Sequence, residues 1–163
     1  SVDDFLAFCG DLAHFLALPA TYTASSTPAS GYLAAKVDQI QALFDSAYSS
    51  VLANVTNSAY SAGFQLALWE VIYENGATLN LSTGGFKANS SAVGQANSFL
   101  AGLDGWSGPK LYDLTFLEGS KSQFLITASA AATPPAIPLP GAVWLLGAGI
   151  AGLATASRRR KSA

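Results

Sequence analysis

Two side chains in this sequence are of types that can react with one another: the thiol of Cys9 and the carboxamide of Gln65. Cys9 is the only cysteine among 163 residues, so no disulfide can form within the chain. Both residues have structural interpretations, since a lone cysteine usually packs as a small hydrophobe and a core glutamine usually hydrogen-bonds a backbone group. If Gln65 instead has a reactive partner, Cys9 is the candidate that the chain offers.

A strongly apolar segment, residues 63–76, carries Gln65 and is predicted to be a helix. Its apolar side chains recur at helical spacing, at Phe64, Leu68, Val71 and Ile72. Gln65 shares a neighbouring line with Trp69 and Ile72. Asn75-Gly76 predicts the end of this helix, because both residue types tolerate the left-handed conformation.

The remaining pattern predicts one α+β domain over residues 1–127, with helices packed with a small antiparallel sheet. The predicted elements are a short strand at 5–9 broken by Gly10, a loop at 21–31, a helix at 32–54, a helix from Ser90 or Ser91 to Gly102, and a hairpin of 111–117 with 122–127. Residues 128–136 are small or proline, which predicts a linker.

Charge and composition narrow the possible functions. Outside the C-terminal basic cluster the chain has four lysines against ten acidic residues, and an acidic body argues against nucleic-acid binding. One cysteine and one histidine exclude a zinc or iron–sulfur cluster of the usual ligands. We therefore expect no metal and no cofactor. The absence of methionine leads us to expect that an upstream segment, such as a signal peptide, precedes Ser1 in the translated product.

The C-terminal tail is predicted to be a membrane segment, residues 137–157. No residue from Gly141 to Ala156 is charged, and a helix counted from Ile137 would span about 30 Å, close to a bilayer core. The cluster Arg158, Arg159, Arg160 and Lys161 then acts as a cytoplasmic membrane stop. The acidic body would lie outside the cytoplasm. The alternative is a buried C-terminal helix, which the terminal basic cluster disfavours.

This tail resembles the PEP-CTERM sorting signal of Gram-negative bacteria, in its Val-Pro-Leu-Pro-Ala variant. The order of proline motif, glycine-rich apolar span and arginine cluster carries the resemblance, with Ile137 and Gly141 in place of Val and Ala. The resemblance implies that Pro138, Leu139 and Pro140 are the recognition motif for an exosortase. It also implies an exported protein, anchored in the inner membrane and then passed to the cell surface or extracellular matrix.

The body resembles the bacterial thioester domains of surface adhesins. Two segments carry this resemblance, Phe8-Cys9-Gly10-Asp11-Leu12 and Gln65-Leu66-Ala67-Leu68-Trp69, and a later Gln-x-Leu at Gln123 fits a third. Phe64 departs from the small residue or Thr usual before the glutamine. The resemblance implies an internal thioester between Cys9 and Gln65. Such a bond forms when a thiolate attacks the carboxamide and ammonia leaves, which requires fixed geometry.

The function expected from both resemblances is covalent attachment to amines. A stored acyl group would be captured by an amine, such as a lysine on a surface or matrix protein. Phe8, Phe64 and Trp69 would slow hydrolysis by excluding water. The protein would be consumed in the reaction, so we expect a single-use reagent and not an enzyme.

Several alternatives stay open at the level of sequence. The main one is a structural or carbohydrate-binding matrix protein with an inert Cys9, and another is a hydrolase that uses Cys9. His14 could pair with Cys9 or assist acyl transfer, although a surface histidine is the simpler interpretation. Asp11 either orients the Cys9 turn or caps a helix. Acidic pairs at Asp3-Asp4 and at Glu70 and Glu74 suggest calcium or a carboxylate dyad, but one helical turn of spacing is more typical of a solvated face.

Overall fold

A computed structural model describes residues 5–29, 31–76 and 78–132 of the chain. The elements in these ranges are β1 (Ala7–Cys9), β2 (Tyr22–Ser25), α1 (Gly31–Ala34), α2 (Val37–Ala53), α3 (Ser58–Tyr73), α4 (Val93–Ala101), β3 (Tyr112–Gly119) and β4 (Leu125–Ala130). The contacts within the chain separate Ser1–Ala132 from Thr133–Ala163, and residues 133–163 lie outside the described residues. The predicted α+β class is confirmed.

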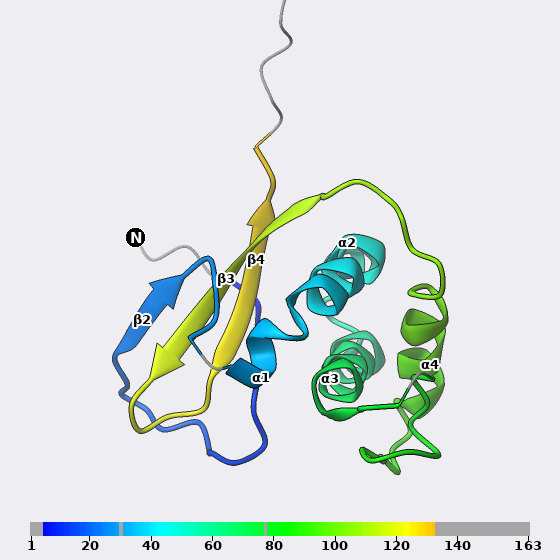
Figure 1. Ribbon diagram of the computed structural model, residues 1–163, viewed down its shortest axis with the longest axis horizontal. Helices are drawn as coiled ribbons and strands as arrows, with labels where there is room; N and C mark the ends of the chain where they lie inside the picture. Colours follow the sequence, from blue (N-terminus) through cyan, green and yellow to red (C-terminus); the bar gives the residue numbers. More distant parts are fainter. Residues whose placement is uncertain (1–4, 30, 77, 133–163) are drawn as a thin grey trace, which may run out of the picture. The chain divides into compact units, whose positions relative to one another are not determined.

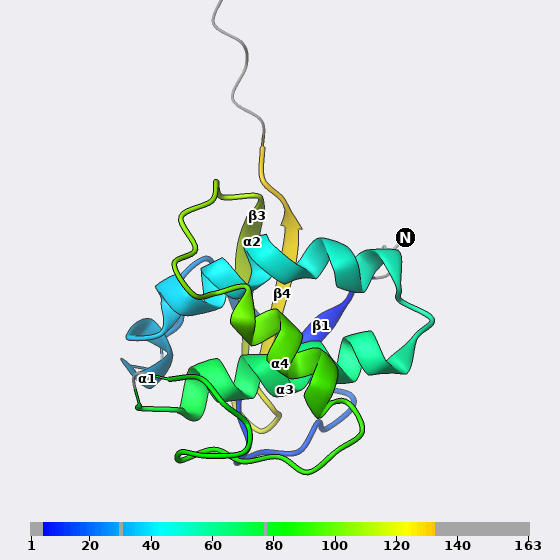
Figure 2. The ribbon, with the colours of Figure 1, turned by 90° about the vertical axis from the view of Figure 1, so that its right-hand side faces the viewer.

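The four strands form one antiparallel sheet in the order β1-β4-β3-β2. The predicted hairpin is β3 with β4, which register Leu114 against Ala128 and Phe116 against Ile126. The short β1 pairs with the other side of β4, which places Cys9 opposite Leu125 at the start of that strand. Figures 1 and 2 show α2 and α3 over one face of this sheet, with α4 packed on the side of these helices that faces away from the strands.

An aromatic cluster joins the two layers. Phe8 from β1 packs against Phe64 of α3 with 4.6 Å between ring centroids, and Phe44 of α2 lies 5.0 Å from Phe64. All three side chains are buried. The predicted apolar stripe of α3 is confirmed, because its four members are buried in the same core. β1 is therefore held against the helices by a core side chain that directly precedes Cys9.

Several predicted boundaries are wrong. The segment 21–31, predicted as a loop, contains β2, which pairs with β3. The helix predicted over 32–54 is interrupted between α1 and α2. Ala128 to Ala130, predicted to be the start of a linker, continue β4 opposite β3, and residues 133–136 of that predicted linker lie outside the described residues. Small residues are tolerated in β4 since the partner strand supplies the backbone hydrogen bonds.

The sequence pattern favoured a solvated face for the two acids at the end of α3, and this prediction is wrong. Glu70 and Glu74 are 0% and 4% exposed. Glu70 accepts a hydrogen bond from the backbone N–H of Asn80, and Glu74 accepts from those of Gly76 and Gly85. The loop after α3 folds back over the helix, and these carboxylates satisfy its backbone. Glu74, held by these N–H groups, has its pKa below the ordinary value, whereas burial raises the pKa of Glu70.

No helix within the described residues is both long and apolar enough to cross a bilayer. The predicted membrane segment 137–157, the motif at Pro138, Leu139 and Pro140, and the basic cluster from Arg158 to Lys161 lie outside those residues, as do Asp3 and Asp4.

The contact between Glu74 and its loop predicts that Gly84→Ala destabilises the fold. Gly84 has a φ of +96°, and an added Cβ would meet Oε2 of Glu74. We expect a loss of about 1–3 kcal/mol in the free energy of unfolding, measured by denaturant titration. Gly94→Ala is the matched control, because a Cβ there meets nothing within 4 Å in α4, and it should stabilise by up to about 1 kcal/mol. Equal effects of the two substitutions would contradict this account.

Candidate functional site

The structure brings Cys9 and Gln65 together through two hydrogen bonds. The backbone N–H of Cys9 donates to Oε1 of Gln65 at 2.8 Å, and Nε2 of Gln65 donates to the carbonyl oxygen of Cys9 at 2.9 Å. Residues 56 positions apart in sequence thus form a closed pair, which we call the Cys9–Gln65 clamp. It fixes which end of the amide is oxygen, because a backbone N–H can only donate and a carbonyl can only accept.

The clamp occupies the free edge of the sheet. In antiparallel pairing, successive residues turn their backbone groups alternately toward and away from the partner strand. The N–H of Gly10 donates to the carbonyl of Phe124 at 2.7 Å, so Gly10 and Phe8 face β4 and Cys9 faces outward. Its N–H and C=O would otherwise be unpaired at a half-buried edge. The side chain of Gln65 takes the place of a neighbouring strand there.

A line of α3 side chains follows the segment after Cys9. Gln65, Trp69 and Tyr73 are spaced at i, i+4 and i+8, which places them on one side of the helix. Gln65 binds the backbone of Cys9, and the hydroxyl of Tyr73 accepts a hydrogen bond from the backbone N–H of Leu12 at 2.9 Å. The helix advances about 12 Å between these two contacts, and the segment from Cys9 to Leu12 runs in the same direction as the helix. Helix and segment therefore run side by side.

Trp69 lies between those two contacts. Its ring packs against Phe86 at 6.3 Å between centroids. Its indole N–H is buried without a hydrogen-bond partner among the described residues. Phe8 and Phe64 are buried beneath the clamp, so two of the three expected shielding residues are core residues. The clamp itself is half-buried at both of its residues.

Asp11 orients the turn after Cys9. Its Oδ1 accepts from the backbone N–H groups of Ala13 and His14 and contacts Nδ1 of His14, and its Oδ2 accepts from Phe124 N–H at 2.7 Å. Burial raises the pKa of Asp11, but the hydrogen bonds from Phe124 and His14 outweigh it, and the pKa lies below its ordinary value. Asp11 thus fixes the turn to the start of β4 as a carboxylate.

Gln123 and His14 lie near the same turn. Nε2 of Gln123 donates to the backbone oxygen of Asp11 at 2.7 Å, so the third segment of the resemblance supports the Cys9 turn and does not enter the clamp. The His14 side chain is 63% exposed, as the simpler interpretation held. Its contact is with Asp11.

The thiol of Cys9 is protonated at neutral pH. Burial raises its pKa, and the nearby charge of Asp11 raises it further. A thiol of this kind is a weak nucleophile until it is deprotonated. The fixed geometry of the clamp is therefore what the structure contributes to any reaction of this sulfur.

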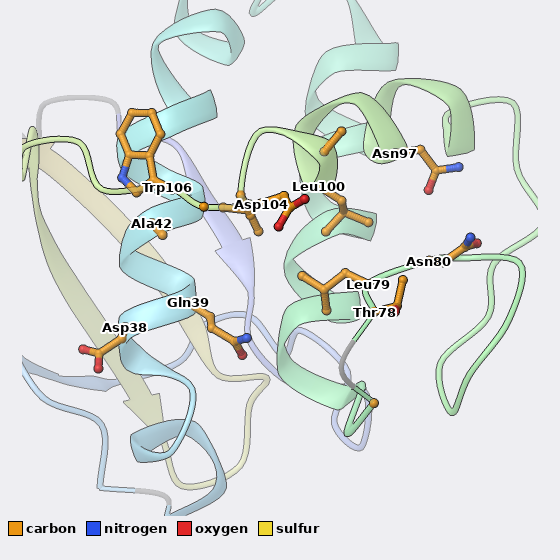
Figure 3. A pocket seen from close by; sticks show the side chains of 14 residues that line it. Asp38, Gln39, Ala42, Thr78, Leu79, Asn80, Asn97, Leu100, Asp104 and Trp106 are labelled. Atoms are coloured by element: carbon orange, nitrogen blue, oxygen red, sulfur yellow. The ribbon is translucent and has the colours of Figure 1, made fainter.

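Two clefts lie outside the clamp. The larger, about 740 Å³, is bounded by α2, the loop after α3 and the end of α4, with Gln39, Asn80, Asp104 and Trp106 among its lining residues (Figure 3). The second, about 650 Å³, lies beside the Asp11 turn and includes Tyr73 and Glu118. Neither is lined by Cys9 or Gln65. Within the described ranges no group of three His, Cys, Asp or Glu side chains could hold a metal ion.

No protein-family model matches the chain, and comparisons with curated proteins and with solved structures found no match either.

Sequence reasoning had paired Cys9 with Gln65 but had missed Tyr73, whose contact with Leu12 continues the clamp. The i, i+4, i+8 spacing of Gln65, Trp69 and Tyr73 was the available signal. It had also missed that the backbone of Cys9, and not its thiol, makes the hydrogen bonds.

The clamp predicts a pH-dependent loss of stability in Gln65→Glu. At neutral pH a carboxylate oxygen would face the carbonyl of Cys9 with no proton between them, at a cost of about 1–3 kcal/mol. Protonation restores a donor, so the folded-state pKa of the introduced carboxyl group would be raised. Stability lost at pH 7 is then recovered relative to wild type as the pH falls through that raised pKa. Denaturant titrations at several pH values measure this, with Gln39→Glu on the exposed side of α2 as control. A pH-independent difference would contradict the clamp.

Proposed function

We propose that the protein forms an internal thioester between Cys9 and Gln65 and uses it to attach covalently to amines. The observation that supports this is the Cys9–Gln65 clamp, which holds the carboxamide against the residue that bears the thiol. Formation joins Sγ of Cys9 to the side-chain carbonyl carbon of Gln65. The C–N bond breaks, and the amide nitrogen leaves as ammonia with the thiol proton.

The clamp provides two of the conditions that this reaction needs. The backbone N–H of Cys9 donates to the oxygen that becomes negative in the tetrahedral intermediate, which is the role of an oxyanion donor. Backbone hydrogen bonds at a strand edge lie near the plane of the sheet, whereas side chains stand roughly perpendicular to it. The Cys9 side chain therefore leaves that plane on one face of the carboxamide, and attack on a carbonyl comes from a face.

The raised pKa of the Cys9 thiol slows both the formation of the thioester and its cleavage. A protonated thiol makes formation slow at neutral pH. A thiol of high pKa is also a poor leaving group, because leaving ability falls as the pKa rises. A thioester at this site would consequently persist until a strong nucleophile such as an amine reaches it.

Intact-mass measurement tests the thioester. The purified protein should be lighter than its calculated mass by one ammonia and should not react with a thiol alkylating reagent. Methylamine should add at Gln65 and expose the Cys9 thiol in equal amount. Cys9→Ala should retain the full mass and take up no methylamine, and Gln39→Ala, at an exposed position of α2, serves as the control for a glutamine outside the clamp. A wild-type protein with full mass and an alkylatable thiol from the outset would contradict the proposal.

We propose further that residues 137–157 span the inner membrane and that an exosortase recognises Pro138, Leu139 and Pro140. The support is the order of motif, uncharged span and basic cluster in the sequence. Replacing Pro138 and Pro140 with alanine should leave uncleaved protein in the membrane fraction, as followed by immunoblot of cell fractions. The Cys9→Ala variant should be released normally. Unchanged release of the proline variant would contradict the sorting signal.

A second candidate function is saccharide binding by a non-reactive matrix protein, and the larger cleft favours it. Its lining combines an exposed indole ring at Trp106 with amide and carboxylate side chains and no lysine or arginine. Such a lining suits a neutral polyhydroxyl ligand, which stacks on an aromatic face and hydrogen-bonds to polar groups. An alkylatable Cys9 in a protein of full mass would favour this function over the thioester.

A further inference from the structure

The clamp distinguishes the two hydrogens of the Gln65 amide. Both ends of the carboxamide are bound by the backbone of a single residue, at 2.8 and 2.9 Å, so the two hydrogen bonds lie side by side. The hydrogen donated to the carbonyl of Cys9 must therefore be the one on the same side as Oε1. The other hydrogen points away from Cys9.

A primary amide has a hydrogen in that position, but the usual form of a secondary amide does not. In a trans secondary amide the substituent on nitrogen lies on the same side as the oxygen. On Gln65 that substituent would occupy the position of the donated hydrogen, within the 2.9 Å that separates Nε2 from the Cys9 oxygen, where no carbon chain fits. The cis form would restore the N–H, but it is disfavoured by roughly a hundredfold in simple secondary amides.

We propose that the backbone of Cys9 is a positioning element specific for a primary amide, which makes capture of an alkyl amine one-way. This inference rests on the proposed thioester. Aminolysis forms a C–N bond to Gln65 and breaks the C–S bond, and the amine proton is transferred to Cys9 sulfur. The secondary amide that results cannot return to the clamp in its trans form. The thiol then no longer has a held, polarised carbonyl to attack.

Ammonia behaves differently from an alkyl amine in this scheme. Its attack on the thioester regenerates the original primary amide of Gln65, which fits the clamp and can react with Cys9 again. The free protein can therefore cycle between amide and thioester while ammonia is exchanged. A lysine side chain ends the cycle because it leaves a substituent on the nitrogen. The clamp thus distinguishes the primary amide, which can form the thioester again, from the secondary amide adduct, which cannot.

The experiment compares two products of the same thioester protein. One portion is opened with ammonia and another with methylamine, both are desalted, and both are incubated at the same pH while intact mass and free thiol are followed. We expect the ammonia-treated protein to lose one ammonia again and its thiol to disappear. The methylamine adduct should keep its mass and its thiol, with re-formation slower by roughly a hundredfold. Hydrogen exchange at the Cys9 amide should be faster in the adduct than in the ammonia-treated protein.

Re-formation of the thioester at similar rates from both products would overturn the inference, and so would failure of the ammonia-treated protein to re-form it. Equal protection of the Cys9 amide in the two products would also overturn it, since that N–H is held only while the clamp is closed. Failure of the thioester proposal is seen separately, in the mass of the untreated protein before either amine is added.

Discussion

The free edge of a three-residue strand is the constraint on which the described fold depends. β1 pairs with β4 on one side only, and a strand this short cannot be stable from that ladder alone. Phe8 holds it to the aromatic core, and Gln65 satisfies the outward backbone groups of Cys9. One glutamine therefore replaces a fifth strand at this position. With its backbone groups bound by a side chain, this edge is less available for pairing with another chain at Cys9.

Buried carboxylates hold the long connections of this chain in the same way. Asp11 accepts backbone N–H groups at the Cys9 turn and at the start of β4, and Asp45 accepts those of Leu111 and Tyr112 at the start of β3. Glu74 does so for the loop after α3. A carboxylate has two oxygens that can each accept several bonds, so one buried acid can fix two segments. The chain's few acids are therefore used partly to order backbone that no strand or helix pairs.

Local patterns were sufficient for the elements that bury a regular face. The stripe of α3 and the alternation of β3 and β4 have the periods of helix and strand, and both are present as predicted. β2 was missed because Thr and Ser next to prolines look like a loop, and only the neighbouring strand makes this segment extended. Glu70 and Glu74 were misjudged for a related reason. Acids one helical turn apart have the same spacing whether they face water or a loop that folds back, and the sequence does not show the fold of that loop.

The local sequence contexts of Cys9 and Gln65 predicted that these two residues pair. They did not predict which atoms make the contact. Which backbone groups of β1 face outward depends on its register with β4, and no turn joins these two strands to fix that register. The backbone contacts of Cys9 could therefore be found only once the sheet was known.

The position of β4 has a mechanical consequence. This strand lies between β1 and β3, its first residue is beside Cys9, and its far end leads to Ala132 and the tail. A pull between a partner fixed at Gln65 and an anchor beyond Ala132 would run along β4. Hydrogen bonds in an antiparallel sheet are perpendicular to the strands, so such a load shears both ladders at once and cannot open them one bond at a time. Under the proposed attachment at Gln65 and anchorage beyond Ala132, the hairpin would resist tension along β4.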